Sequence, residues 1–276
     1  MSTASNHSPN QIITVTRPLA AIIVPILVAA FIMLFLFPNH TGLLFAWPIK
    51  PTMSAMMLGG TYLGGAYYFT AVFRAQQWHN VKLGFLPVSS FAGILGIATL
   101  LHWDKFTPGH ISFILWVFLY LTLPIIIPVI WHLNQRLNPS ASPPEIPLSV
   151  SFCWSIGSLG AVLVVVSLIL LIAPNGLIPT WPWTLSPLTA RVMAAMFALS
   201  GFVALGVAIN KDWSAARIPL QAQAIAVILI LIALFRAPAE ILWQSWGSWL
   251  FVAGLLTVLA LIMWGNIQGR RQRVTV

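Results

Sequence analysis

Eight long apolar runs constrain this chain more than any other feature of its sequence. Each run is about twenty residues long and is bounded by charged residues, proline or asparagine. A helix in lipid satisfies its own backbone hydrogen bonds, and about twenty residues are enough to cross the hydrocarbon core. The sequence therefore predicts an all-α integral membrane protein with eight transmembrane helices, at approximately 18–37, 52–73, 83–102, 110–132, 149–173, 188–209, 218–236 and 244–265.

Composition agrees with a membrane protein and excludes other classes. Hydrophobic residues make up 59% of the chain and charged residues 6%, with a mean hydropathy of +0.92, whereas soluble domains carry far more charge. The thirteen basic residues are spread along the chain as membrane-flanking charges are, so we expect no nucleic-acid partner. Cys153 is the single cysteine, which excludes disulfides within the chain and metal centres built on several cysteines.

A stretch of the first half recurs in the second half, 136 residues later and without a gap. Because seven identities are hard to obtain by chance, the match predicts an internal duplication, with the eight spans forming two repeats of four. Four is an even number, so both repeats enter the membrane in the same direction, as a parallel duplication. The identical residues are Pro38, Asn39, Trp47, Pro51, Met57, Leu63 and Gly65, which match Pro174, Asn175, Trp183, Pro187, Met193, Leu199 and Gly201.

The longest polar segment, rich in proline and serine, separates the two repeats. Such a segment can neither continue a helix nor bury surface, so we interpret it as a linker. The predicted divisions are an N-terminal tail at 1–17, a first repeat at 18–133, the linker at 134–148, a second repeat at 149–266 and a basic tail at 267–276.

Basic residues are unequally divided between the two predicted sides of the membrane. Nine lie on the side of the termini and the linker, and four lie on the other side: Lys50, Lys105, Arg191 and Arg236. The positive-inside rule then places both termini in the cytoplasm. The first apolar run is too long for a signal-peptide core and has no small-residue cleavage site, so we expect it to be retained as a span.

The two equivalent outer connections, 38–51 and 174–187, are apolar and contain tryptophan. Because indole rings favour the headgroup layer, Trp47, Trp181 and Trp183 are expected to anchor segments along the outer membrane surface. The alternative is a lid over a cavity.

Small residues repeat along the second span of each half. Gly60, Gly64 and Gly65 lie in the first copy, and Gly201 follows two alanines in the second. Spacing by four residues lets a neighbouring backbone approach closely, so we predict helix packing within the chain. A homodimer seam and a ligand contact are the alternatives.

Five of the six histidines fall near span ends in the first half. Haem would need two imidazoles that face each other inside the bilayer, and the candidates for it are His79, His132, His102 and His110. A zinc or copper site on the outer side would suit imidazoles with a carboxylate, and its candidates are His40, His102, Asp104 and His110. Haem would require these histidines to lie a turn or more deeper than the predicted span ends, and no short ligand spacing supports the metal site. We therefore predict no cofactor and expect histidines that bind water or headgroups.

Charged residues on the outer side are costly in a membrane and so need partners. Arg191 lies inside the sixth span, while Arg236 and Glu240 flank the connection between the seventh and eighth. We predict a structural network in which an arginine pairs with Glu240, since an unpaired buried charge is destabilising. A proton or anion site at the outer mouth is the alternative.

Three phrases resemble a group of bacterial multispan membrane proteins without an assigned activity: Trp183 to Arg191, Asp212-Trp213 and His102 to Phe106. The resemblance covers most of the chain and implies a bacterial inner membrane, but it implies no mechanism.

Sequence motifs for nucleotide hydrolysis, zinc proteolysis and serine hydrolysis are absent. Their absence favours a non-catalytic membrane protein, either a binder of a small molecule or lipid or an accessory subunit of a membrane complex. A transporter with a path between the repeats is the first alternative. A redox subunit that holds haem or quinone is the second.

Overall fold

The computed structural model describes residues 12–138 and 145–274, and these residues are helical, with an isolated bridge between Pro147 and Asp212 as their only β pairing. The all-α prediction is confirmed for this part of the chain. A short helix, α2 (Thr41–Leu44), lies in the first connection. The eight long helices of the described residues are α1 (Thr16–Phe31), α3 (Thr52–Arg74), α4 (Phe85–Leu101), α5 (Ile111–Leu137), α6 (Val150–Ile172), α7 (Pro187–Asn210), α8 (Trp213–Arg236) and α9 (Trp246–Val274).

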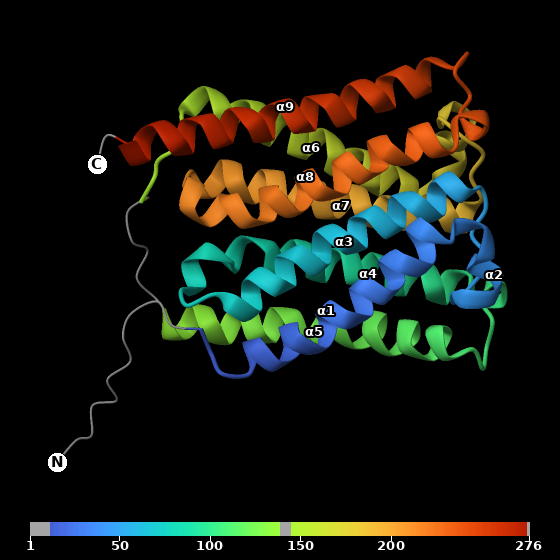
Figure 1. The fold of residues 1–276 in the computed structure, drawn as a ribbon, viewed down its shortest axis with the longest axis horizontal. Helices are drawn as coiled ribbons and strands as arrows, with labels where there is room; N and C mark the ends of the chain where they lie inside the picture. Colours follow the sequence, from blue (N-terminus) through green and yellow to red (C-terminus); the bar gives the residue numbers. More distant parts are fainter. Residues whose placement is uncertain (1–11, 139–144, 275–276) are drawn as a thin grey trace.

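The long helices lie side by side and alternate in direction along one axis (Figure 1). The start of α1, the ends of α5 and α9 and the start of α6 lie at one end of the bundle together with the α3–α4 and α7–α8 connections, and we call this the termini end. The remaining connections lie at the opposite end, the loop end. Short connections between sequential helices lead to this up-and-down order.

Within residues 12–138 and 145–274, seven helices are long and apolar enough to cross a membrane, so the chain is a multi-pass membrane protein. The prediction named eight, and α3 is the long helix that falls outside the seven, although it has 23 residues. Its glycines, threonines and tyrosines lower its hydropathy. Fourteen of its residues are buried, mainly between α1 and α8. A helix enclosed by other helices meets little lipid and does not need a uniformly apolar surface.

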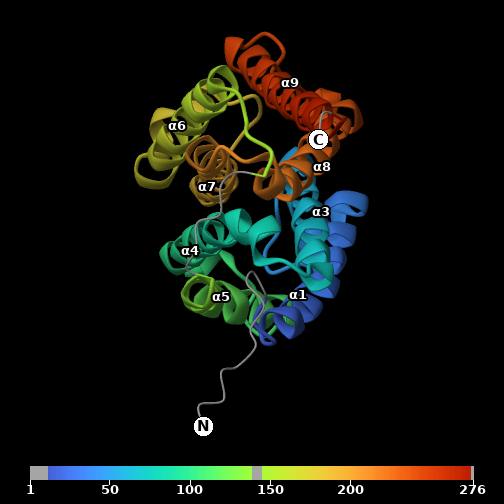
Figure 2. The ribbon, with the colours of Figure 1, turned by 90° about the vertical axis from the view of Figure 1, so that its left-hand side faces the viewer.

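The helices group into two halves, α1 to α5 and α6 to α9 (Figure 2). In the first half α1 packs on α3 and α4 on α5, and in the second half α6 packs on α7 and α8 on α9. The halves meet where α3 packs on α8 and α4 packs on α7. One cluster of buried hydrophobic residues extends through both halves.

Helices extend beyond the predicted division limits. α5 continues to Leu137, inside the predicted linker, and α9 continues to Val274, inside the predicted tail. The described end of the linker docks on the α7–α8 connection, where Leu148 N donates to the Lys211 carbonyl and Trp213 N donates to the Ile146 carbonyl, each at 2.9 Å. Residues 139–144 of the predicted linker lie outside the described residues.

The tryptophans of the two outer connections are buried in the protein. Trp47, Trp181 and Trp183 are 2%, 7% and 0% exposed, so the expectation that they anchor the chain in the headgroup layer is wrong. The Trp47 ring packs 5.0 Å from the Phe106 ring and 4.8 Å from the Trp116 ring. The connections fold inward over the helix ends, where large aromatic rings bury more surface than they would along a membrane.

Candidate functional site

A cavity of about 400 Å³ lies among the helices of the second half and reaches the contact with the first half. Its walls come from α6, α7, α8 and α9, with α3 and the start of α4 on the remaining side. Each wall helix contributes residues three or four positions apart, such as Met196, Ser200 and Val203 on α7, which places one face of the helix toward the cavity. The volume falls within the range of roughly 300–1,000 Å³ that small-molecule sites occupy.

The cavity is open to the outside of the bundle between α6 and α9. Val162 on α6 and Leu250 on α9 both line it, and their side chains are 58% and 62% exposed. Both residues belong to helices that are long and apolar enough to cross a membrane. The opening therefore faces lipid rather than water.

Aromatic rings close the cavity toward the loop end. The Trp181 ring lies 5.8 Å from the Phe197 ring and 6.1 Å from the Phe251 ring, and all three residues line the cavity. Trp183 supports this wall 5.7 Å from Trp181, and its Nε1 donates to the Ser54 hydroxyl of α3 at 2.8 Å. The α6–α7 connection thus holds a fixed wall over one end of the cavity.

Two glycines of α9 explain why the cavity opens beside this helix. Gly247 lies so close to the Thr180 backbone that a side chain would collide with it, which holds the start of α9 against the α6–α7 connection. Two turns later, a Cβ on Gly254 would meet nothing within 4 Å, although Gly254 lines the cavity. α9 is therefore held at its start and leaves open space farther along.

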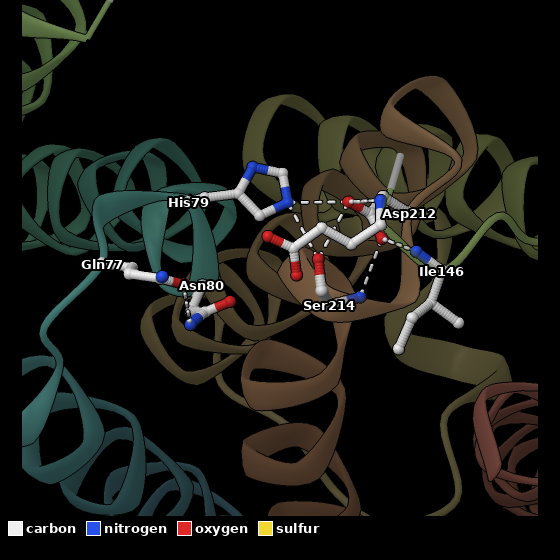
Figure 3. A network of polar contacts seen from close by, with 7 residues as sticks. Gln77, His79, Asn80, Ile146, Asp212 and Ser214 are labelled. Atoms are coloured by element: carbon white, nitrogen blue, oxygen red, sulfur yellow. Dashed lines mark hydrogen bonds and ion pairs between the residues drawn. The ribbon is translucent and has the colours of Figure 1, made fainter. Parts of the chain in front are cut away.

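A second candidate site is a polar network around Asp212 at the termini end (Figure 3). The Asp212 carboxylate, 1% exposed, accepts hydrogen bonds from Ser214 N at 3.0 Å, from the Ser214 hydroxyl at 2.9 Å and from Glu145 N and Ile146 N at 3.2 Å. His79 Nε2 lies 2.7 Å from it. Burial alone would raise the pKa of Asp212, but the hydrogen bonds from His79 and Ser214 outweigh burial and hold this pKa well below its usual value.

The Asp212 network joins three segments that are distant in sequence. His79 comes from the α3–α4 connection, Ile146 from the end of the linker, and Asp212 is the N-cap of α8. His79 was predicted only as a haem candidate and Asp212 was named only in the Asp212-Trp213 phrase, because the two residues are 133 positions apart and no motif spacing connects them. The one sequence signal that could have indicated Asp212 was its position directly before an apolar helix, where aspartate is a favoured N-cap residue.

His79, Asp212 and Ser214 are not arranged for nucleophilic catalysis. In a Ser-His-Asp triad the serine and the acid contact opposite imidazole nitrogens. Here Asp212 Oδ2 and Ser214 Oγ both lie against Nε2, at 2.7 and 2.9 Å, and the serine hydroxyl donates to the carboxylate. The hydroxyl hydrogen is committed to the acid, so we assign this group to holding the termini end together.

Glu240, predicted in an outer charged network, caps α3. Its carboxylate accepts from the N–H groups of Thr52 and Met53 at 3.0 and 2.7 Å and from the Thr52 hydroxyl at 2.8 Å. In the described chain neither Arg191 nor Arg236 forms an ion pair with it. The unpaired N–H groups at the start of α3 carry partial positive charge and take the place of the expected arginine.

The two arginines of the predicted network, both at the loop end, donate to carbonyl groups at or just beyond the ends of α1 and α6. Arg236 donates to the Phe35 carbonyl and places its guanidinium 5.1 Å above the Phe35 ring. Arg191 donates through Nε to the Leu171 carbonyl at 3.1 Å. Phe35 and Leu171 are 136 residues apart, the offset of the sequence match. Each arginine therefore supplies donors where a helix ends with unpaired carbonyls.

His102 contacts Arg191 rather than other histidines. Its Nε2 lies 2.9 Å from Arg191 Nη1, and burial together with the arginine charge lowers the pKa of His102. Asp104 instead forms an exposed ion pair with Lys105 at 2.7 Å. Because arginine can only donate, the His102 nitrogen that faces it acts as an acceptor.

The other histidines of the predicted haem and metal sites lie apart. His110 caps α5, where its side chain accepts from Ser112 N, and its Nε2 lies 3.0 Å from the Leu43 carbonyl. His40 ends a short helical turn after α1, and His132 lies on α5. Within residues 12–138 and 145–274 no three His, Cys, Asp or Glu side chains come close enough to hold a metal ion.

The glycines predicted to pack helices lie against three different neighbours. Gly60 and Gly64 face α8, Gly65 faces Leu27 of α1, and Gly201 faces α6. A Cβ on Gly64 would come 2.5 Å from the Ala222 carbonyl oxygen. Gly65 and Gly201, which match in the two copies, therefore face the first helix of each half, α1 and α6, whereas Gly60 and Gly64 pack between the halves.

No family model, curated protein or solved structure matches this chain.

Proposed function

We propose that this multi-pass membrane protein binds a lipid-soluble small molecule or a lipid chain in the cavity enclosed by α6, α7, α8 and α9. The observation that carries the proposal is this cavity of about 400 Å³. Its walls are almost wholly apolar, and Val162 and Leu250 mark an opening between two membrane-compatible helices. A ligand could enter sideways from the bilayer without crossing water.

Packing supplies the physical reason for binding. Protein interiors are close-packed, and atoms that line an empty cavity lose dispersion contacts on one side. An apolar ligand that fills the space restores those contacts. Because lipid chains are as apolar as the cavity wall, transfer out of lipid adds little free energy by itself. Shape, and any polar group in the wall, then selects the ligand.

The proposal includes eight spans arranged as two parallel repeats of four. α3 counts as a span because 23 residues reach about 34 Å as a helix and because α1 and α8 flank it. The helix contacts support the duplication. In the proposed repeat, the helices of the second half that correspond to α1, α3, α4 and α5 are α6, α7, α8 and α9. The α1–α3 and α4–α5 pairs then correspond to the α6–α7 and α8–α9 pairs. The two contacts between the halves, α3–α8 and α4–α7, correspond to each other.

We assign the termini end to the cytoplasmic side of a bacterial inner membrane. Support comes from the basic residues, nine of which belong to segments of the termini end and four to segments of the loop end. Cytoplasmic ends of spans carry such an excess of Lys and Arg. Reaction of an introduced cysteine at each end with an impermeant thiol reagent would measure the orientation.

A cavity-filling substitution tests the binding proposal. Gly254→Phe would place a ring in open space inside the cavity. Leu256→Phe is the matched control, because Leu256 lies on the same helix, is more than half exposed and does not line the cavity. Each protein would be purified in a mild detergent, and molecules extracted from it would be quantified by mass spectrometry.

We expect the unaltered protein and the Leu256→Phe variant to retain one apolar molecule per chain and the Gly254→Phe variant to lose it. Similar melting temperatures of the two variants would show that the loss is not due to misfolding. Equal retention by all three proteins would contradict the proposal.

A further inference from the structure

We infer that the ligand of this cavity carries an oxygen atom that accepts hydrogen bonds inside the bilayer, so that the site selects a neutral carbonyl or hydroxyl compound on an apolar chain. The inference rests on the proposed binding function and deepens it. It comes from three mostly buried polar side chains of the cavity wall that lack hydrogen-bond partners in the described protein: Trp181, Ser200 and Gln223. Trp246 also lines the cavity without such a partner, but it is exposed.

Trp181 contributes a buried donor. Its side chain lines the cavity, and its Nε1 has no hydrogen-bond partner among the described residues. An indole N–H can only donate, and leaving such a donor buried and unpaired is destabilising. The neighbouring Trp183 has no such deficit, because Ser54 accepts from it. The missing partner of Trp181 must be an acceptor.

Ser200 and Gln223 contribute two more polar groups, which lie at the same distance from the α7–α8 connection. Both lie on the cavity-facing sides of their helices, and neither makes a hydrogen bond with a residue that the structure describes. α7 and α8 are joined by Lys211 and Asp212, and Ser200 lies eleven residues before Lys211 while Gln223 lies eleven residues after Asp212. Both therefore sit about 16 Å from that connection, near mid-membrane.

Trp181 contacts the cavity face of α7 about one helical turn from Ser200. Trp181 stacks against Phe197, which is three residues before Ser200 and so on the same face of α7. Gln223 occupies the corresponding level of α8. Other hydroxyl groups of the wall already have acceptors in the protein: Thr61 donates to the Met57 carbonyl, Tyr68 to the Val81 carbonyl and Thr180 to the Leu177 carbonyl.

The chemistry of the wall defines the ligand class. None of the described residues that line the cavity is charged, so an ionised ligand would lie there without a counter-ion from them, at high cost. A phospholipid keeps its headgroup at the membrane surface, out of reach of groups about 16 Å deep. An oxygen atom on an otherwise apolar molecule meets both conditions and can accept from the indole, hydroxyl and amide donors. Long-chain quinones and long-chain alcohols share this chemistry.

Binding of three probes to the purified protein tests the inference. Decyl-benzoquinone presents carbonyl oxygens, dodecanol presents a hydroxyl group, and decylbenzene has a similar apolar size without oxygen. Native mass spectrometry across a concentration series would give the affinity of each. We expect at least one oxygen-bearing probe to bind about tenfold or more tightly than decylbenzene, as two or three hydrogen bonds predict. Tighter binding of one oxygen-bearing probe than of the other would support the inference and would show whether the ligand oxygen belongs to a carbonyl or to a hydroxyl group.

Substitutions connect the affinity to named groups. Ser200→Ala and Gln223→Leu should each weaken binding of the preferred oxygen probe about fivefold, as the loss of one hydrogen bond predicts, and leave decylbenzene unchanged. Gln221→Leu is the control, because Gln221 lies on the same helix with its amide oxygen accepting from the Tyr67 hydroxyl at 2.7 Å, outside the cavity. It should change neither affinity.

Equal binding of all three probes would overturn the inference and leave the binding proposal intact, since water would then satisfy the three groups. Unchanged affinities in both Ser200→Ala and Gln223→Leu would also overturn it. Absence of any probe binding, together with a Gly254→Phe variant that retains as much extracted material as the unaltered protein, would instead overturn the proposed function.

Discussion

Replacing Asp212 by alanine should destabilise the protein more than any other single change at the termini end. The carboxylate is buried and accepts from Ser214, Glu145 and Ile146 in addition to its contact with His79. One hydrogen bond to a charged group contributes roughly 1.5–3 kcal/mol, and loss of an N-cap costs about 0.5–2 kcal/mol. These contributions share one carboxylate and do not add fully.

We therefore expect Asp212→Ala to lower the free energy of unfolding by roughly 3–5 kcal/mol, the range for breaking one side of a buried pair. For a protein of this size the melting temperature should fall by roughly 6–20 °C. Thermal unfolding in detergent, followed by tryptophan fluorescence, would measure the change. Asp104→Ala is the matched control, because its ion pair with Lys105 is exposed and should contribute little.

The pH dependence of the Asp212 contribution follows from its lowered pKa. A carboxyl group whose pKa is lower in the folded state stabilises the fold fully above its unfolded pKa, about 3.9. The contribution is lost as the pH falls below that value toward the folded pKa. The difference between the native protein and Asp212→Ala should therefore be constant from about pH 5 upward and shrink below about pH 4.

Two results would refute this reasoning. A loss below about 1 kcal/mol for Asp212→Ala would mean that the network adds no more than a surface contact. An equal loss in Asp104→Ala would mean that carboxylates stabilise this protein through net charge rather than through the hydrogen bonds in Figure 3.

Three further substitutions test packing and capping. Gly64→Ala places a Cβ 2.5 Å from the Ala222 carbonyl oxygen, so α3 and α8 must separate and the melting temperature should fall by several degrees; an unchanged value would contradict the packing. Glu240→Gln weakens the cap on the first two N–H groups of α3, and denaturant unfolding should show a loss of about 1 kcal/mol. Trp183→Phe removes the hydrogen bond to Ser54 and should cost about 1 kcal/mol in the same assay; full stability would argue against that bond.

The helical class and most spans were predictable because they depend on local requirements. Each apolar run had to form a helix to satisfy its backbone, and proline or charge marked its ends. α3 shows the limit of this reasoning, since its hydropathy is lowered by residues that only the surrounding helices make acceptable. The buried Trp47 shows another limit, because an indole at a span end suits either a headgroup or a core of aromatic rings.

The candidate sites were far less predictable. Asp212 and His79 meet across 133 residues, and Glu240 reaches α3 across 188. Neither contact has a spacing that a sequence pattern could reveal. Gln223 and Ser200 could be recognised as polar residues within apolar runs, but their equal depth matters only because both face the same cavity.

The order of the amino acids is enough to make this chain a helical membrane protein, because a backbone in lipid must pair with itself within each short segment. The 136-residue match, on which the predicted repeat depends, is also a property of the sequence. The position of the cavity is not, because a cavity forms where six helices together fail to fill space. Nor is the set of polar groups that lack partners, since pairing depends on neighbours that come from distant parts of the chain.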